Sequence, residues 1–193
     1  MRLIAFVLAV IAVATAAGAA ERWREYGYLE NAFAIQFPGQ PTVSEGSYAT
    51  ALLTVNATIY ALEQDGARYV VTVADFSNTK LSELTVLELA VENLHHDGDV
   101  TVDVPHRVNR HFGRQLSVTG HDGSRSSVAL FYYQRRLYLI QGTMLATNAD
   151  TGSSDGARFQ QSLRFTNDAR PRGEELNRLR YLGPDPPRFP SER

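Results

Sequence analysis

Two neighbouring segments in the second half of the chain are apolar on both faces, and this limits the fold more than any other feature. Residues 124–133 and 136–146 have the composition of strands, and in the first segment neither alternating set is polar. The two sets are Val128, Leu130 and Tyr132, and Ala129, Phe131 and Tyr133. Because successive side chains of a strand point to opposite faces, the sheet must be covered on both sides.

Helices are the expected cover. The clearest helix spans residues 82–96, where four apolar side chains recur on one face, Ser82 is a suitable N-cap and Gly98 follows the end. A second, weaker helix is predicted over 155–163. The remaining predicted strands are residues 23–29, 32–37, 52–63, 68–76, 99–104 and 115–120, with 52–63 and 68–76 joined as a hairpin around Asp65-Gly66. The fold class that follows is α+β, an antiparallel β-sheet sandwiched by helices.

The first twenty residues have the features of a secretory signal peptide. Arg2 is followed by eleven apolar residues and then by a run of small residues. The small residues satisfy the signal-peptidase rule at two adjacent positions, so we expect cleavage after Ala19 or Ala20. An uncleaved membrane anchor is the alternative, but the second half of the segment is weakly hydrophobic and no cationic cluster follows it. We therefore expect an exported protein, periplasmic or secreted, with no stable membrane anchor after cleavage.

The rest of the chain divides into one domain and a tail. Residues 21–167 form the predicted single α+β domain. Residues 168–193 contain five prolines and six arginines among few apolar residues. This composition predicts a partly disordered C-terminal tail, with a short helix over 172–182 at most.

Composition excludes several classes of chemistry. The 193 residues include no cysteine, which rules out disulfides, cysteine-ligated zinc, thiol catalysis and a lipidated N-terminal cysteine. The formal net charge is −2, whereas domains that bind nucleic acid are usually strongly basic. We therefore expect no nucleic-acid partner.

Four short motifs carry a resemblance to a known group of proteins. They are Phe37-Pro38-Gly39-Gln40-Pro41, Gly113-Arg114-Gln115-Leu116, Arg136-Leu137-Tyr138 and the segment from Arg158 to Phe165. In this respect the chain resembles small exported bacterial proteins similar to the PsbP and Mog families, over residues 26–166. The resemblance implies an α/β/α sandwich around an antiparallel sheet. It also implies partner binding, since the best-known members are non-catalytic: an extrinsic subunit of photosystem II and a binder of a nuclear-transport GTPase. No partner-contacting residue of those proteins is matched here.

Three motifs that could carry chemistry are set aside. Residues 152–156 read G-x-S-x-G, but the hydrolase motif needs a later histidine and the last one is His121. His95 and His96 are adjacent on the predicted helix, so they point about 100° apart and are poorly placed to share a metal ion. The sequon at Asn56 falls inside a predicted strand and is given no weight. No catalytic, cofactor-binding or metal-binding residue is assigned, and no cofactor is expected.

Charge is segregated along the middle of the chain. Residues 81–103 contain six acids and no lysine or arginine, whereas residues 104–121 contain three arginines, three of the five histidines and no acid. The basic stretch falls where a loop is expected between two strands. Two readings stay open: solvated faces that pair with each other, or a basic loop that meets an anionic partner. On the second reading the partner-binding residues are Arg107, Arg110, His111 and Arg114.

These observations favour an exported, non-catalytic binding or accessory protein that contacts a protein partner through the basic loop. The alternatives are an enzyme whose active site is not recognisable from sequence, and a structural component of the cell envelope. An enzyme would show a deep pocket with convergent polar groups. A binding protein would show an exposed apolar or charged patch instead.

Overall fold

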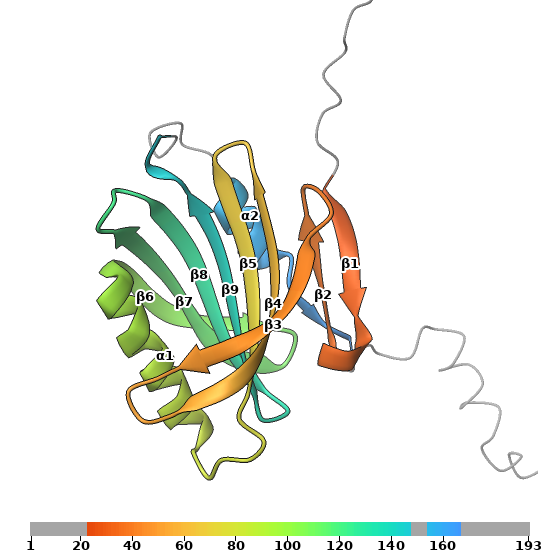
Figure 1. Cartoon of the computed structure of the whole chain (residues 1–193), viewed down its shortest axis with the longest axis vertical. Coiled ribbons are helices and arrows are strands. Elements are labelled where there is room, and N and C mark those ends of the chain that lie inside the picture. The colour runs from red at the N-terminus through yellow and green to blue at the C-terminus, as the bar shows by residue number, and fades with distance from the viewer. Residues whose placement is uncertain (1–22, 148–153, 167–193) are drawn as a thin grey trace, which may run out of the picture.

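The structure, a computed structural model, describes residues 23–147 and 154–166 (Figure 1). Within these residues it is mostly antiparallel β-sheet with two α-helices. The predicted signal peptide, residues 1–20, and the predicted tail, residues 168–193, lie outside the described residues.

A seven-stranded antiparallel sheet is the centre of the fold, with strand order β3-β4-β5-β9-β8-β7-β6. Its strands are β3 (Thr42–Ala49), β4 (Thr54–Gln64), β5 (Ala67–Asp75), β6 (Gly98–Val108), β7 (His111–Gly120), β8 (Arg125–Tyr133) and β9 (Arg136–Met144). Its central strands are buried on both faces, as the sequence predicts: Val128 and Leu130 of β8 belong to one apolar cluster, and Ala129 and Phe131 belong to the other.

Helix α1 (Glu83–Asp97) covers one face of this sheet. The hydroxyl oxygen of Ser82 accepts a hydrogen bond from the backbone N–H of Thr85 at 3.2 Å, which confirms the predicted N-cap. The buried side chains of α1 pack on Leu116, Val128 and Leu130. The 3.6-residue period of the sequence therefore identified this helix, and three of the four residues of the predicted face, Leu87, Val91 and Leu94, are buried. The fourth, Leu84, is 69% exposed because it lies in the first turn at the edge of the buried face, which is centred on Val86, Ala90 and Leu94 instead.

The opposite face is covered differently from the prediction. A small sheet of β1 (Arg24–Tyr28), β2 (Phe33–Phe37) and β10 (Arg164–Phe165), in the order β1-β2-β10, packs there together with the short helix α2 (Asp155–Gln161). A 3-10 turn, η1 (Leu29–Asn31), joins β1 to β2. Helix α2 has only seven residues and cannot cover a face alone, so Phe33, Ile35 and Phe37 of β2 supply the remaining apolar surface. The expected helical layer on both faces is thus corrected to one helix on one face and a mixed layer on the other (Figure 1).

Neither edge strand of the large sheet is fully predicted from the sequence. Strand β3 was not predicted, and β6 and β7 extend through residues 105–114, where a loop was expected. Edge strands are exposed on both faces at many positions, as most of β3 is, so they lack the alternating pattern that identifies a strand. The basic segment is therefore a β-hairpin with a two-residue turn.

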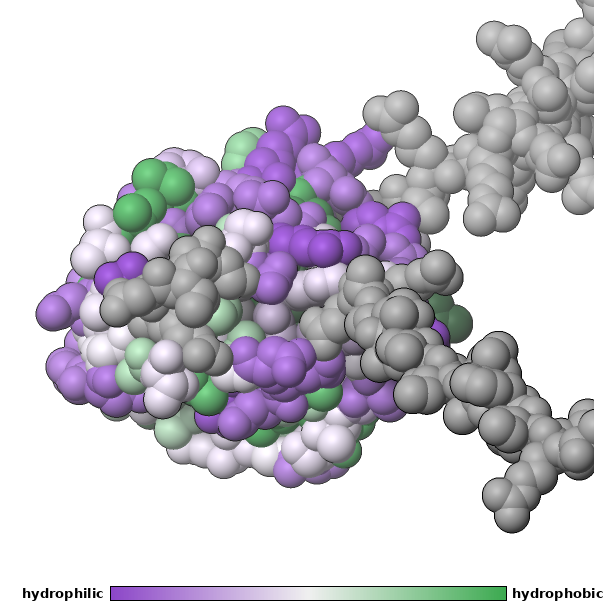
Figure 2. All heavy atoms as spheres, turned by 90° about the horizontal axis from the view of Figure 1, so that it is seen from above, coloured by the Kyte–Doolittle hydropathy of each residue, from purple (hydrophilic) through white to green (hydrophobic). Residues whose placement is uncertain are grey.

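Among the described residues, no helix is long and apolar enough to cross a membrane. The end of the molecule seen in Figure 2 is mostly hydrophilic, with hydrophobic side chains scattered between polar ones. Isolated exposed apolar residues of this kind are normal for a folded protein.

Candidate partner-binding surface

The four predicted partner-binding residues lie on the β6–β7 hairpin. Arg107 is next to the last residue of β6, Arg110 is in the turn, His111 opens β7, and Arg114 lies three residues further along β7. Pairing of Val108 with His111 closes the hairpin, and Asn109 has a φ of 54° in the turn. Because residues 102–108 of β6 pair without interruption with residues 111–117 of β7, side chains in this part of the hairpin have fixed faces and do not form one loop surface.

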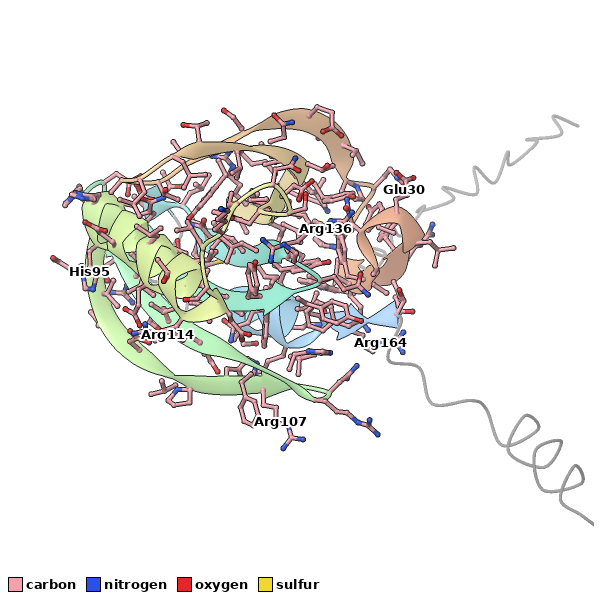
Figure 3. All side chains as sticks on the ribbon, turned by 90° about the horizontal axis from the view of Figure 1, so that it is seen from below. Glu30, His95, Arg107, Arg114, Arg136 and Arg164 are labelled. Atoms are coloured by element: carbon pink, nitrogen blue, oxygen red, sulfur yellow. The ribbon has the colours of Figure 1, made fainter. Side chains whose placement is uncertain are left out.

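Arg114 is engaged inside the molecule. Its Nε donates to Asp103 at 2.9 Å, its Nη1 donates to Glu88 of α1 at 2.7 Å, and its Nη2 also reaches Asp103. The hydrogen bonds with Asp103 are the main reason that the pKa of Arg114 lies above its usual value. Here the acidic and basic segments of the sequence pair with each other, and Arg114 links α1 to the sheet, while its role in partner binding stays a prediction. Figure 3 shows Arg114 beside α1 and Arg107 well away from it.

His111 belongs to an aromatic cluster on the other face of the hairpin. Its ring centroid lies 4.2 Å from that of Tyr133 and 5.1 Å from that of Phe165. Phe165 in turn packs edge-on against Phe131 and Tyr138. His111 is half-buried in this packing, which holds the hairpin against the small sheet, and its role in partner binding likewise stays a prediction.

Arg107 and Arg110 remain exposed, together with an aromatic residue that the sequence analysis did not select. Phe112 is 66% exposed, and the guanidinium of Arg107 lies over its ring at 5.3 Å. The Nε of Arg107 also donates to the carbonyl of Asn109 at 3.0 Å, which fixes the side chain along the turn. Among residues 23–147 and 154–166, no acidic side chain pairs with Arg107 or Arg110. We call Arg107, Arg110 and Phe112 the hairpin patch.

Gly113 and His106 hold the base of the hairpin patch. A Cβ at Gly113 would lie 2.1 Å from the carbonyl oxygen of Leu130 and 2.5 Å from the ring of Phe131, so only glycine fits beside these groups. His106 pairs with Gly113 across the hairpin, and its ring lies 5.6 Å from that of Phe131. Burial lowers the pKa of His106 below its usual value, and its Nε2 is buried with no hydrogen-bond partner among the described residues.

An acidic groove lies beside the hairpin, between α1 and β6–β7. It encloses about 680 Å³, and its charged lining residues are Glu88, Glu92, Asp103 and Arg114, with His95 and His96 toward the end of the helix. Three carboxylates against one guanidinium give this lining a formal charge of 1 − 3 = −2, with histidine neutral. We call Glu88 and Glu92, which lie one helical turn apart, the acidic flank of α1.

The motifs that were set aside have ordinary structural positions. Ser154 stands at the N-cap of α2 without a side-chain cap hydrogen bond, and the first residues of the G-x-S-x-G segment lie outside the described residues. His95 and His96 are exposed in the last turn of α1. In the part of the chain that the structure describes, no group of three or more histidine, aspartate or glutamate side chains is arranged to hold a metal ion.

No family model and no curated protein matches the chain. The solved structures that are similar to it include the following two. The solution structure of the cyanobacterial PsbP protein CyanoP from Synechocystis sp. PCC 6803 is 10% identical over 77% of this chain and 95% of that chain, with a TM-score of 0.49. The crystal structure of PA94 from Pseudomonas aeruginosa, a protein of unknown function and putative regulator, is 12% identical over 77% of this chain and 100% of that chain, with a TM-score of 0.40. The first belongs to the PsbP family that the sequence resembles. At these identities and TM-scores, neither structure assigns a family, a partner or an activity to this chain.

Proposed function

We propose that this protein is an exported, non-catalytic binding protein whose hairpin patch contacts an anionic protein partner. The observation that carries the proposal is the exposure of Arg107 and Arg110 and their lack of an acidic partner among the described residues, although acids are abundant on the adjacent helix. They flank Phe112, whose ring is exposed where a buried position would be expected for a large aromatic side chain.

The chemistry of the hairpin patch suits recognition of a protein. Arginine and aromatic residues are enriched in protein interfaces, where an aromatic ring supplies apolar area and a guanidinium binds carboxylates in a planar, bidentate manner. Arg107 lies against the Phe112 ring, so part of its side-chain freedom is already lost before a partner binds. Two positive charges at a hairpin tip that no acidic side chain of the described residues neutralises also attract an acidic partner from a distance and set its orientation.

Export to the periplasm, or secretion, is part of the proposal. It is supported by the uninterrupted apolar run of residues 3–13 and by the small residues that follow it. The resemblance to the PsbP and Mog families supports a binding role over catalysis, as an analogy at the level of the fold. In the envelope, the partner would be a protein with an exposed acidic segment.

The test is photo-crosslinking from the hairpin patch in intact cells. A photoreactive amino acid replaces Phe112 in the full chain, and crosslinked products are identified by mass spectrometry. The same probe replaces Val43 on β3 as a control, because Val43 is also an exposed apolar residue but lies on the opposite edge of the sheet. We expect one recurrent protein partner from position 112 and none from position 43.

Charge variants then test the role of the arginines. Arg107→Ser with Arg110→Ser should abolish the crosslink at position 112. Arg24→Ser with Arg68→Ser changes the net charge equally at two exposed arginines on other strands and should leave the crosslink unchanged. Retention of the same crosslinked partner in the Arg107/Arg110 variant at low salt would refute the proposal. Co-purification of a small molecule in place of a protein would favour the enzyme alternative instead.

A further inference from the structure

The hairpin patch and the acidic flank of α1 lie on the same side of the large sheet. Phe112 and Arg114 are two residues apart on β7, so their side chains share the face that α1 covers. Arg107 pairs with Phe112 across the hairpin and shares this face, and Arg114 binds Glu88 of α1 at 2.7 Å. One surface therefore carries a basic end at the hairpin tip and an acidic end along the helix.

An exposed apolar side chain lies near each charged end. Phe112 lies opposite Arg107 in the hairpin and about 7 Å from Arg114 along β7, toward the hairpin tip. Leu84 is 69% exposed and lies one helical turn before Glu88, on the same flank of α1. The ion pairs of Arg114 with Asp103 and Glu88 stand between the hairpin patch and Glu92, so the surface runs from a basic end, through these paired charges, to an acidic end.

A surface with this order is complementary to itself. Rotation by a half-turn about an axis between the two ends places the basic end of one copy against the acidic end of the other, twice over. We propose that this surface binds a second copy of the chain in a two-fold dimer that covers Phe112 and Leu84. Such a contact combines exposed apolar side chains with complementary charges, as protein interfaces do.

The face of the hairpin is better suited to this contact than its edge. Strand β6 is an edge strand, and pairing of two β6 edges would extend the sheet. Pro105 pairs with Arg114 in the middle of β6 and has no N–H to donate, which blunts the edge against addition of another strand. A second copy therefore binds through side chains on the α1 face.

This inference rests on the proposed function, because the dimer covers the same hairpin patch that would meet the anionic partner. The acidic flank of a second copy occupies the position of that partner, so self-association and partner binding compete. The protein would then expose its hairpin patch only as a monomer, and the balance would depend on its concentration and on salt.

The protein is purified in the form in which the expressing cell accumulates it. Sedimentation equilibrium of this protein over a wide range of concentrations at low salt tests the dimer. We expect the mass to double with concentration and the dimer to weaken at high salt. Variant A carries Arg107→Glu and Arg110→Glu, and variant B carries Glu88→Lys and Glu92→Lys. Each variant alone has surfaces of one sign and should dimerise at least about tenfold more weakly than the wild type.

Mixing the two variants gives the decisive measurement. In an A–B pair, each acidic end meets a basic end at both contacts, so an equimolar mixture should recover the dimer. Circular dichroism of A and B separately checks that both are folded. A monomeric wild type at all concentrations, or a dimer that is insensitive to both reversals, overturns the inference.

A further variant separates this inference from the proposed function. Glu92→Lys alone removes a charge from the acidic flank but leaves the hairpin patch intact. It should weaken the dimer and leave the crosslink from position 112 to the envelope partner unchanged or stronger. If that crosslink persists while the wild type is monomeric, the dimer is disproved and the partner-binding proposal stands. If the dimer forms and no partner crosslinks, the proposed function fails alone.

Discussion

At the scale of single residues, His106 makes folding sensitive to pH. Burial lowers its pKa in the folded state below the usual value of 6.5, because the buried Nε2 finds no hydrogen-bond partner among the described residues. The folded state therefore binds a proton at His106 less readily than the unfolded state does. Its contribution to stability is complete above pH 6.5 and is lost as the pH falls from 6.5 through the lowered folded-state pKa.

Comparison of two histidine variants tests this. We expect the free energy of unfolding of the wild type, measured with denaturant at pH 7.5 and pH 5.5, to fall on acidification. His106→Leu should show a smaller fall, because it removes the group that binds the proton. His106→Gln removes the same titrating group but keeps a polar side chain, and it should show the same smaller fall. An equal pH slope in His106→Leu and the wild type would show that His106 does not titrate as described.

At the scale of elements, the β8–β9 turn fastens the connection between β5 and α1. Gln134 and Arg135 have φ values of 50° and 60°, as a type I′ hairpin turn requires, although neither is glycine. The guanidinium of Arg135 donates to the carbonyl of Ser77 at 3.3 Å and also reaches the carbonyls of Phe76 and Thr79. The backbone N–H of Phe76 bonds back to the carbonyl of Arg135 at 2.9 Å.

Loss of this side chain should loosen the start of α1. We expect Arg135→Ala to lower the free energy of unfolding by about 1–2 kcal/mol, because several carbonyls lose a charged donor. Arg68→Ala removes an exposed arginine that has no partner among the described residues and should change stability by less than about 0.5 kcal/mol. Hydrogen exchange should also quicken near Thr79 in Arg135→Ala. Equal stability of the two variants would contradict the fastening role.

The elements that could be predicted from sequence are those that bury a face. Helix α1 has a 3.6-residue period, and β8 and β9 contain runs that are apolar on both faces, residues 128–133 and 137–140, so their places were identified. Strand β3 and residues 105–108 of β6 have little buried surface, so burial imposed no pattern on them. For the candidate site, the segregated charges of the sequence indicated the segment that forms the β6–β7 hairpin. Arg114 and His111 make contacts inside the molecule, whereas Arg107 and Arg110 are exposed. This difference depends on which face of the hairpin each residue occupies, and the face is known only once the strand register is known.

At the scale of the whole molecule, the two apolar clusters share the strands of one sheet. Alternate residues of β8 and β9 enter one cluster and apolar residues between them pack in the other, while β5 gives four residues to the first cluster and Ala74 to the second. Neither layer can therefore separate without exposing one face of strands that the other layer needs. We expect the described domain to unfold in a single cooperative transition.

The single tryptophan of the chain allows a direct test. Trp23 lies just before β1 and packs against Tyr69 of β5 and Phe159 of α2, with ring centroids 5.3 and 6.5 Å away. Its fluorescence reports the contact between the small and large sheets, whereas far-ultraviolet circular dichroism reports mainly the large sheet. The two probes should give the same denaturation midpoint in the wild type.

Phe159→Ala should move both midpoints together. Phe159 is fully buried among Trp23, Phe37 and Tyr69, so its truncation leaves a cavity and should cost about 3–5 kcal/mol. Phe159→Leu keeps most of the apolar volume and should cost less. An earlier fluorescence transition in either variant would mean that the small sheet and α2 detach before the large sheet unfolds. In that case the hairpin patch, which is anchored to β10 through His111 and Phe165, would lose its support in the same early step.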